Sequence, residues 1–103
     1  MYFDDVQIRQ REDGSYVIDG SYQLDDFIEL FKINLTEDDE DEIGNLTTVA
    51  GLVFLLLDHI PEEGEQVVYK NLEFEVLDMD GHRIDKLIVN VQNESSDETA
   101  NID

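Results

Sequence analysis

Residues Thr47 to Gly64 read TTVAGLVFLLLDHIPEEG and form the only strongly apolar passage of the chain. The part from Val49 to Leu57 contains no polar side chain. At a rise of about 1.5 Å per residue it is too short to cross a hydrocarbon core about 30 Å thick. Leucine dominates the run and a threonine precedes it in the N-cap position, so we predict a buried helix over about Thr48 to His59.

The rest of the chain is expected to pack around this helix. Because the helix is apolar all round, we predict a sheet on one side and a further segment over its back. Gly51 interrupts the run at a cost of about 1 kcal/mol relative to alanine, and we expect a neighbouring backbone to approach closely there. Pro61 and Gly64 then end the helix and turn the chain.

Composition limits the class of protein. The 103 residues, 41% of them apolar, suit one domain with a single core. Twenty-seven acidic residues against six basic ones give a net charge of −21, which repels nucleic acid and anionic lipid and favours cations or basic partners. We therefore expect no nucleic-acid partner. The absence of cysteine excludes disulfides and thiolate metal sites, and we identify no signal peptide or membrane span.

The N-terminal part predicts a β-hairpin. Two candidate strands, residues 7–11 and 15–18, flank Glu12-Asp13-Gly14, where glycine suits a left-handed turn position. A three-residue loop places Ile8 opposite Ile18, whereas a two-residue loop loses this apolar pair. We therefore predict the three-residue turn.

A short amphipathic helix is predicted over Leu24 to Phe31. Asp25 and Asp26 lie in its first turn and Lys32 is expected in its last turn, which suits the helix dipole. Its apolar residues recur at helical spacing and are interpreted as core rather than as a cofactor site: Leu24, Phe27, Ile28 and Phe31.

Six consecutive carboxylates occupy positions Glu37 to Glu42. Like charges at this density oppose local folding, so we interpret the segment as a mobile, solvated loop. The alternative is a weak Mg²⁺ or Ca²⁺ site at Asp39, Asp41 and Glu42, because these cations prefer carboxylate oxygens. An EF-hand is excluded, since Ala50 stands where its loop requires a bidentate glutamate.

The C-terminal third predicts three strands at residues 66–70, 72–77 and 82–91. A two-residue Asp80-Gly81 turn joins the last two. This turn sets the predicted register, which pairs Leu72 with Val89, Phe74 with Leu87, and Glu75 with Lys86 as a cross-strand ion pair.

These elements give an α+β fold with a mixed or antiparallel sheet of about five strands and two helices packed on it. Residues 1–5 are expected to form an N-terminal arm, 6–92 the folded domain and 93–103 a disordered acidic tail. No candidate nucleophile has a base nearby, and there is no glycine-rich phosphate loop. The two histidines, His59 and His82, stand alone and are interpreted as surface residues. We therefore predict a domain that is not an enzyme.

Several short motifs, taken in order, resemble the transporter-associated domain of the CorC/HlyC family. They are DGSYVIDG at 13–20, the helix at 24–31, TVAGLV at 48–53 with IPEEG at 60–64, and LEFEVL at 72–77 with Arg83-Ile84. In that family the domain follows a transmembrane domain and a pair of cystathionine-β-synthase-type nucleotide-binding repeats at the C-terminal end of bacterial inner-membrane proteins. Some members resemble magnesium and cobalt efflux proteins and others are labelled hemolysins.

The resemblance implies a regulatory or accessory domain of an ion-transport protein, on the cytoplasmic side of the bacterial inner membrane. Its expected partners are the membrane and nucleotide-binding domains of the parent protein, with a divalent cation and a homodimer as further candidates. The resemblance brings no catalytic residues. The alternative is a stand-alone acidic protein that binds a basic partner surface. A flavin or nucleotide enzyme fragment is disfavoured, because no basic cluster could hold phosphate.

Overall fold

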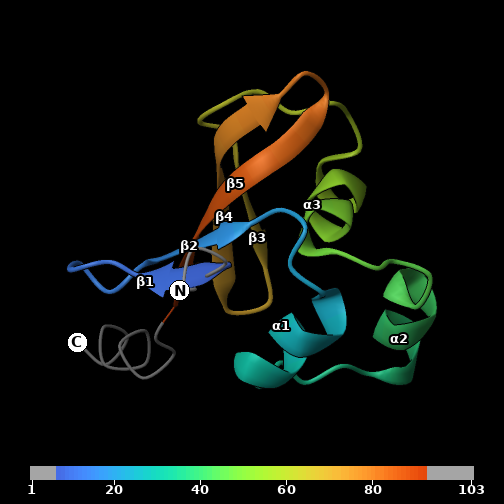
Figure 1. Ribbon diagram of the computed structural model, residues 1–103. Coiled ribbons are helices and arrows are strands. Elements are labelled where there is room, and N and C mark those ends of the chain that lie inside the picture. The colour runs from blue at the N-terminus through green and yellow to red at the C-terminus, as the bar shows by residue number, and fades with distance from the viewer. Residues whose placement is uncertain (1–6, 93–103) are drawn as a thin grey trace, which may run out of the picture.

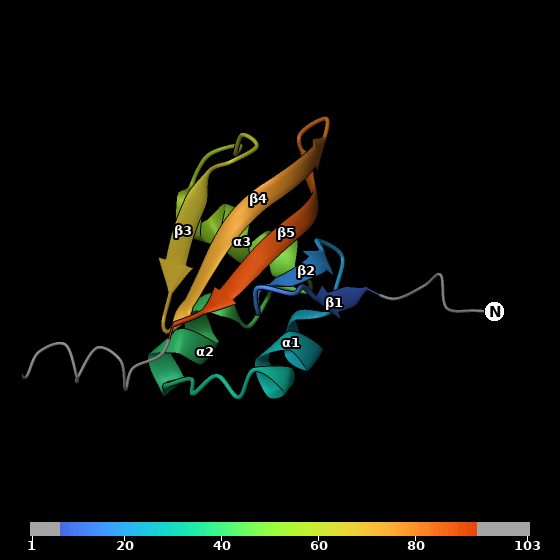
Figure 2. The same cartoon turned by 90° about the vertical axis from the view of Figure 1, so that its left-hand side faces the viewer.

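A computed structural model describes residues 7–92, so the predicted N-terminal arm and acidic tail lie outside the described part of the chain. The elements in chain order are β1 (Ile8–Gln10), β2 (Tyr16–Asp19), α1 (Leu24–Leu30), α2 (Glu37–Ile43), α3 (Val49–Leu57), β3 (Gln66–Tyr69), β4 (Leu72–Asp80) and β5 (Arg83–Val91). The strands form one antiparallel sheet in the order β1-β2-β5-β4-β3. The helices gather on one face of this sheet (Figures 1 and 2). The predicted α+β class is confirmed, with three helices rather than two.

The core lies between the helices and the inner face of the sheet. The ring of Phe27 in α1 lies with its centroid 5.7 Å from that of Phe74 in β4, and both side chains are fully buried. Alternate residues of β4 point inward, as period-two burial requires. Other fully buried apolar side chains are Ile18, Leu24, Val49, Leu52, Val53, Leu72, Val76, Leu87 and Val89. The interpretation of the α1 stripe as core is confirmed, although α1 ends at Leu30 and Lys32 lies beyond it.

The apolar helix α3 forms where predicted, but its back is open. Thr48 is the N-cap, and its hydroxyl accepts a hydrogen bond from the Gly51 amide at 3.2 Å. Leu52 is 1% exposed toward the core, whereas Leu55 is 40% exposed on the other side. The prediction of a segment over the back is therefore wrong for the described residues, because the structure has only one layer of helices on the sheet.

The close backbone approach occurs at Gly20 rather than at Gly51. A methyl group at Gly51 would meet Thr48 Oγ1 at 3.6 Å, an ordinary contact, so the prediction of a tight approach there is wrong. A methyl group at Gly20 would overlap the carbonyl oxygen of Ile84 and lie 3.2 Å from the Ala50 methyl. Gly20 is thus the position where the exit of β2, the start of β5 and helix α3 come together.

The N-terminal hairpin has the predicted register. Ile8 pairs with Ile18, and the Arg11 amide donates a hydrogen bond to the carbonyl oxygen of Ser15 at 2.7 Å. Gly14 has φ = 94°, the left-handed conformation that the loop requires. The three-residue turn is confirmed.

The turn between β4 and β5 lies one residue later than predicted, which shifts the pairing of the two strands by two residues. The loop residues are Gly81 and His82, so Phe74 pairs with Val89 instead of Leu87. Gly81 takes the first loop position with φ = 66°, which only glycine adopts without strain. A shift of two residues keeps every side chain on its predicted face, so the core was predicted correctly although the pairs were not. The predicted Glu75–Lys86 ion pair is wrong, since Glu75 lies opposite Ile88.

The acidic run is a helix and not a mobile loop. Thr36 and Asp39 form a reciprocal capping box at the start of α2, each side chain bonding the backbone N–H of the other residue. The carboxylates of the first turn face the positive end of the helix dipole. At the other end of α2, Ile43 is buried in the core. The capping box and the buried Ile43 side chain therefore outweigh the repulsion between the carboxylates. The prediction of a mobile loop, which was based on that repulsion, is wrong.

Candidate functional site

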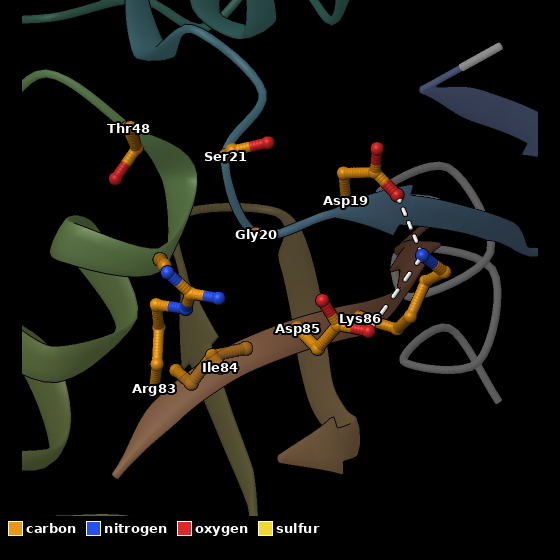
Figure 3. Close-up of a pocket in the computed structure, with 9 residues that line it drawn as sticks. Asp19, Gly20, Ser21, Thr48, Arg83, Ile84, Asp85 and Lys86 are labelled. Atoms are coloured by element: carbon orange, nitrogen blue, oxygen red, sulfur yellow. Dashed lines mark hydrogen bonds and ion pairs between the residues drawn. The ribbon is translucent and has the colours of Figure 1, made fainter. Parts of the chain in front are cut away.

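A depression of about 390 Å³ lies at the Gly20 junction, and we call it the polar depression because most of the residues that line it are polar or charged. Figure 3 shows Asp19, Gly20 and Ser21 at the end of β2, Thr48 at the start of α3, and Arg83 to Lys86 on β5 around this depression. It is formed by three elements that are far apart in the sequence. For this reason we treat it as the candidate site of the domain.

Backbone hydrogen bonds hold these three elements together. The Gly20 amide donates to the carbonyl oxygen of Asp85 at 2.9 Å, and the Ala50 amide donates to the carbonyl oxygen of Gly20 at 3.0 Å. The Val49 amide donates to Tyr22 at 3.0 Å, and the Gly51 amide donates to the Thr48 hydroxyl. The first amides of α3 are thus already engaged, so the helix start is not a free anion-binding end.

The charges around the depression are balanced. The Lys86 ammonium lies 2.9 Å from Asp19 and 3.8 Å from Asp85, as Figure 3 marks, and the hydrogen bond with Asp19 is the main reason why the pKa of Lys86 is raised. Arg83 pairs with Asp80 at 3.2 Å. Each cation of the lining therefore has a carboxylate partner. Such a surface suits contact with a polar partner better than capture of a highly charged ligand.

A second polar cluster lies in the loop after α3. The Glu65 carboxylate accepts a hydrogen bond from the Glu62 amide at 3.0 Å and pairs with the His59 ring. The hydrogen bond from the Glu62 amide lowers the pKa of Glu65, and the Glu65 carboxylate raises the pKa of His59. The predicted surface position of His59 is confirmed, with half of its side chain exposed. His82 is also exposed.

The three carboxylates of the predicted cation site lie on α2 but do not converge. Asp39 and Glu42 are three positions apart and share a side of the helix, whereas Asp41 is two positions from Asp39 and points elsewhere. Within residues 7–92, no group of three or more His, Cys, Asp or Glu side chains is arranged to hold a metal ion. The cation site at Asp39, Asp41 and Glu42 therefore stays a prediction.

Asp39 has a structural partner that the local sequence does not show. Lys70, which follows β3, places its ammonium 2.7 Å from the Asp39 carboxylate. This hydrogen bond, together with the one from the Thr36 amide, lowers the pKa of Asp39 to about 2. The Thr36-x-x-Asp39 spacing is a capping signal that could have predicted the start of α2. The pairing with Lys70 depends on the tertiary fold.

Comparison with known proteins decides the family. The sequence matches the family described as "Transporter associated domain" (CorC/HlyC) over residues 9–93. The chain is a transporter-associated domain of the CorC/HlyC family. The resemblance noted in the sequence motifs is thereby confirmed.

Two relatives show how much of a protein this domain represents. The UPF0053 protein sll0260 of Synechocystis sp. is 45% identical over 93 residues, which cover 90% of this chain and 20% of that protein. The polyamine export protein of Escherichia coli K12 is 35% identical over 83 residues, which cover 81% of this chain and 18% of that protein. The chain therefore spans about a fifth of the length of these relatives.

A solved structure has the same fold. The transporter-associated domain of a Xylella fastidiosa hemolysin, in complex with Mg²⁺ and Mn²⁺, is 31% identical and superposes with a TM-score of 0.70, over 85% of this chain and all of that one. In the described part of the chain, no helix is long and apolar enough to cross a membrane.

The family match connects the domain with membrane transport, because the family is described as a transporter-associated domain.

Proposed function

We propose that this transporter-associated domain is a non-catalytic accessory domain of a bacterial membrane protein that exports cations, and that it regulates the transport unit from the cytoplasmic side. The observation that carries this proposal is the family match over residues 9–93, combined with relatives about five times as long as the match. A domain of this size is a part that acts on a larger transport unit.

The charge of the domain supports a role beside a cation pathway. A net charge of −21 attracts cations and raises their concentration near the surface. The polyamine export protein and the Mg²⁺- and Mn²⁺-bound hemolysin domain are both named with positively charged species. We infer that the parent protein of this chain likewise transports a cation.

The polar depression supports a role in contacts between domains. Lys86 pairs with both carboxylates of the depression, Arg83 pairs with the neighbouring Asp80, and backbone groups of Gly20 and α3 are engaged. The depression therefore presents a pre-formed surface lined mostly by polar residues. Such surfaces are typical of interfaces between domains of one chain. We propose that the membrane and nucleotide-binding domains of the parent protein are its partners, and a second copy of the domain is a further candidate.

The test uses the full-length natural gene product in bacterial membrane vesicles. Residues 9–93 are deleted in one version and kept in the other, and efflux of Mg²⁺, Co²⁺ and a polyamine is followed in both. We expect the deleted protein still to insert into the membrane but to lose its normal dependence of efflux on cation concentration. Unchanged efflux at every concentration would overturn the accessory role.

The same gene product also tests the alternative of a free-standing acidic protein. If the chain occurs without a membrane domain and co-purifies in the soluble fraction with a basic partner, this alternative holds and the accessory role does not. Fractionation of the natural host, with an antibody against the described domain, separates the two. We expect the signal in the membrane fraction.

A further inference from the structure

We propose that the apolar groove between α1 and α2 binds a linear aliphatic amine that carries at least two ammonium groups. The proposal rests on the function proposed above and names the class of cation that the domain senses. The groove lies apart from the polar depression, and the two have no residue in common.

The size and the lining of the groove suit a thin aliphatic chain. Helices α1 and α2 lie side by side below α3 in both views (Figures 1 and 2), and the space between them has a volume of about 260 Å³. Pockets for drug-sized ligands measure about 300–1,000 Å³, so this groove suits a smaller molecule. Its walls are mostly aliphatic and consist of Leu24, Ile28, Leu35, Ile43 and Leu46.

The charged residues that line the groove are all of one sign. They are Asp25 on α1 and Glu40 on α2, and no Lys, Arg or His lines the groove. Both side chains are exposed, and neither takes part in an ion pair or side-chain hydrogen bond within the described residues. The polar depression differs on this point, because its carboxylates, Asp19 and Asp85, are both paired with Lys86.

The combination of an aliphatic lining and two acidic residues without an ion-pair partner among the described residues indicates the class of ligand. An alkyl chain removes apolar surface of the walls from water, and an ammonium group at each end pairs with one carboxylate. A hydrated Mg²⁺ ion keeps its water shell and gains nothing from the aliphatic walls. A monoamine satisfies only one carboxylate. The groove therefore distinguishes an oligoamine from a metal ion of similar total charge.

The binding test uses the 103-residue chain, with spermidine, 1,4-diaminobutane and Mg²⁺ as probes at constant ionic strength. Backbone amide shifts are followed by nuclear magnetic resonance. We expect saturable shifts of residues 24–28 and 35–46 with both amines, with spermidine binding more tightly. Mg²⁺ should give weaker shifts that are not confined to the groove. Equal shifts with Mg²⁺ at the same positions would show that charge alone is responsible and would overturn the proposal.

Paired variants separate the groove from the general charge of the domain. We expect Asp25→Asn combined with Glu40→Gln to weaken spermidine binding by about tenfold, the usual order for loss of a charged hydrogen bond. The control, Glu12→Gln with Asp78→Asn, removes the same charge at exposed positions outside the groove and should change the Kd less than twofold. Similar weakening in both pairs would overturn the proposal.

Failure of the amine-binding test can be distinguished from failure of the proposed accessory function. If deletion of residues 9–93 alters efflux but no amine binds in the groove, only the amine site is wrong. If the amines bind as expected but deletion leaves efflux unchanged, only the accessory role is wrong. The amide spectrum without ligand shows that each variant is folded.

Discussion

Helices α2 and α3 follow one another in the chain but are held in place by different interactions. All nine residues of α3 are apolar or glycine, and its core side is buried against the sheet. Six of the seven residues of α2 are carboxylates, and only Ile43 is buried. Burial stabilises α3, whereas capping, the helix dipole and the Lys70 ion pair stabilise α2.

The comparison shows that a short helix can be stabilised either by burial of an apolar face or by capping and charge interactions at its ends. Isolated helices of this length are marginal in water, so each of these two needs help from outside its own backbone. For α3 this help comes from a surface that is insensitive to pH and salt. For α2 it comes from charges and hydrogen bonds, which are screened by salt and respond to pH.

The largest effect is expected for a core residue of α3. Leu52→Ala should lower the free energy of unfolding by about 2–5 kcal/mol, because it removes a buried side chain and leaves a cavity. Urea titration monitored by circular dichroism measures this loss. Leu55→Ala, on the open side of the same helix, serves as the control and should cost less than about 1 kcal/mol. Equal losses would mean that the back of α3 is covered after all.

The next effect concerns the place where α3 meets the sheet. Gly20→Ala should destabilise the domain by about 1–3 kcal/mol, because the new methyl group would overlap the Ile84 carbonyl oxygen. Gly51→Ala should be neutral or stabilising by up to about 1 kcal/mol, since there is room and alanine favours helix. Thermal unfolding of the two variants decides the matter. If Gly51→Ala is destabilising, a neighbouring group must approach Gly51 closely, as the sequence alone predicts.

Substitution of the N-cap threonine in each of the two helices should have a smaller effect on stability. Thr36→Ala and Thr48→Ala each remove a hydroxyl that accepts a helix amide, and each should cost about 1 kcal/mol. Hydrogen exchange should show the loss in different ways. Helix α2 should open locally without Thr36, whereas α3 should remain protected without Thr48, since the core holds it. Local opening of α3 as well would refute the proposed difference.

The smallest effect is a pH dependence of α2. The pKa of Asp39 is about 2 in the folded protein, below the ordinary 3.8, so its pair with Lys70 stabilises the fold above about pH 4. This contribution falls as the pH drops below about 4, and half of the Asp39 carboxyl is still ionised at its pKa of about 2. Lys70→Met should therefore be less stable than wild type at pH 7, and most of the difference should be lost by about pH 2. A difference as large at pH 2 as at pH 7 would show that packing of Lys70 is responsible rather than its charge.

Much of the fold could be predicted from local patterns. The apolar run predicted α3, the spacing of Leu24 and Phe27 predicted α1, and the loop around Gly14 predicted the register of the first hairpin. These predictions succeeded because the residues responsible lie within a few positions of one another. The β4–β5 turn was displaced because Gly81 can occupy either of two loop positions in a two-residue turn.

The candidate sites were less predictable. The polar depression combines residues 19–21, 48–50 and 83–86, and the groove combines residues 24–28 with 35–46. The motifs at 13–20 and 48–53 and the pair Arg83-Ile84 contain most of the first set, but the sequence does not show that they meet. Each site is defined by residues from separate elements. The acidic run drew attention to Asp39 by its charge alone, whereas the structure gives that residue a role as helix cap and partner of Lys70.

Periodicity and glycine positions therefore specified the class of fold and most of the core residues, since these depend on spacing within short stretches of the chain. Only the tertiary structure showed that Gly20 is the tight junction, that Lys70 pairs with Asp39 across 31 positions, and that Asp25 and Glu40 line the same groove as aliphatic side chains. These features depend on which segments meet when the helices cover one face of the sheet. That packing is decided by the shape of the whole core, which no single stretch of sequence contains.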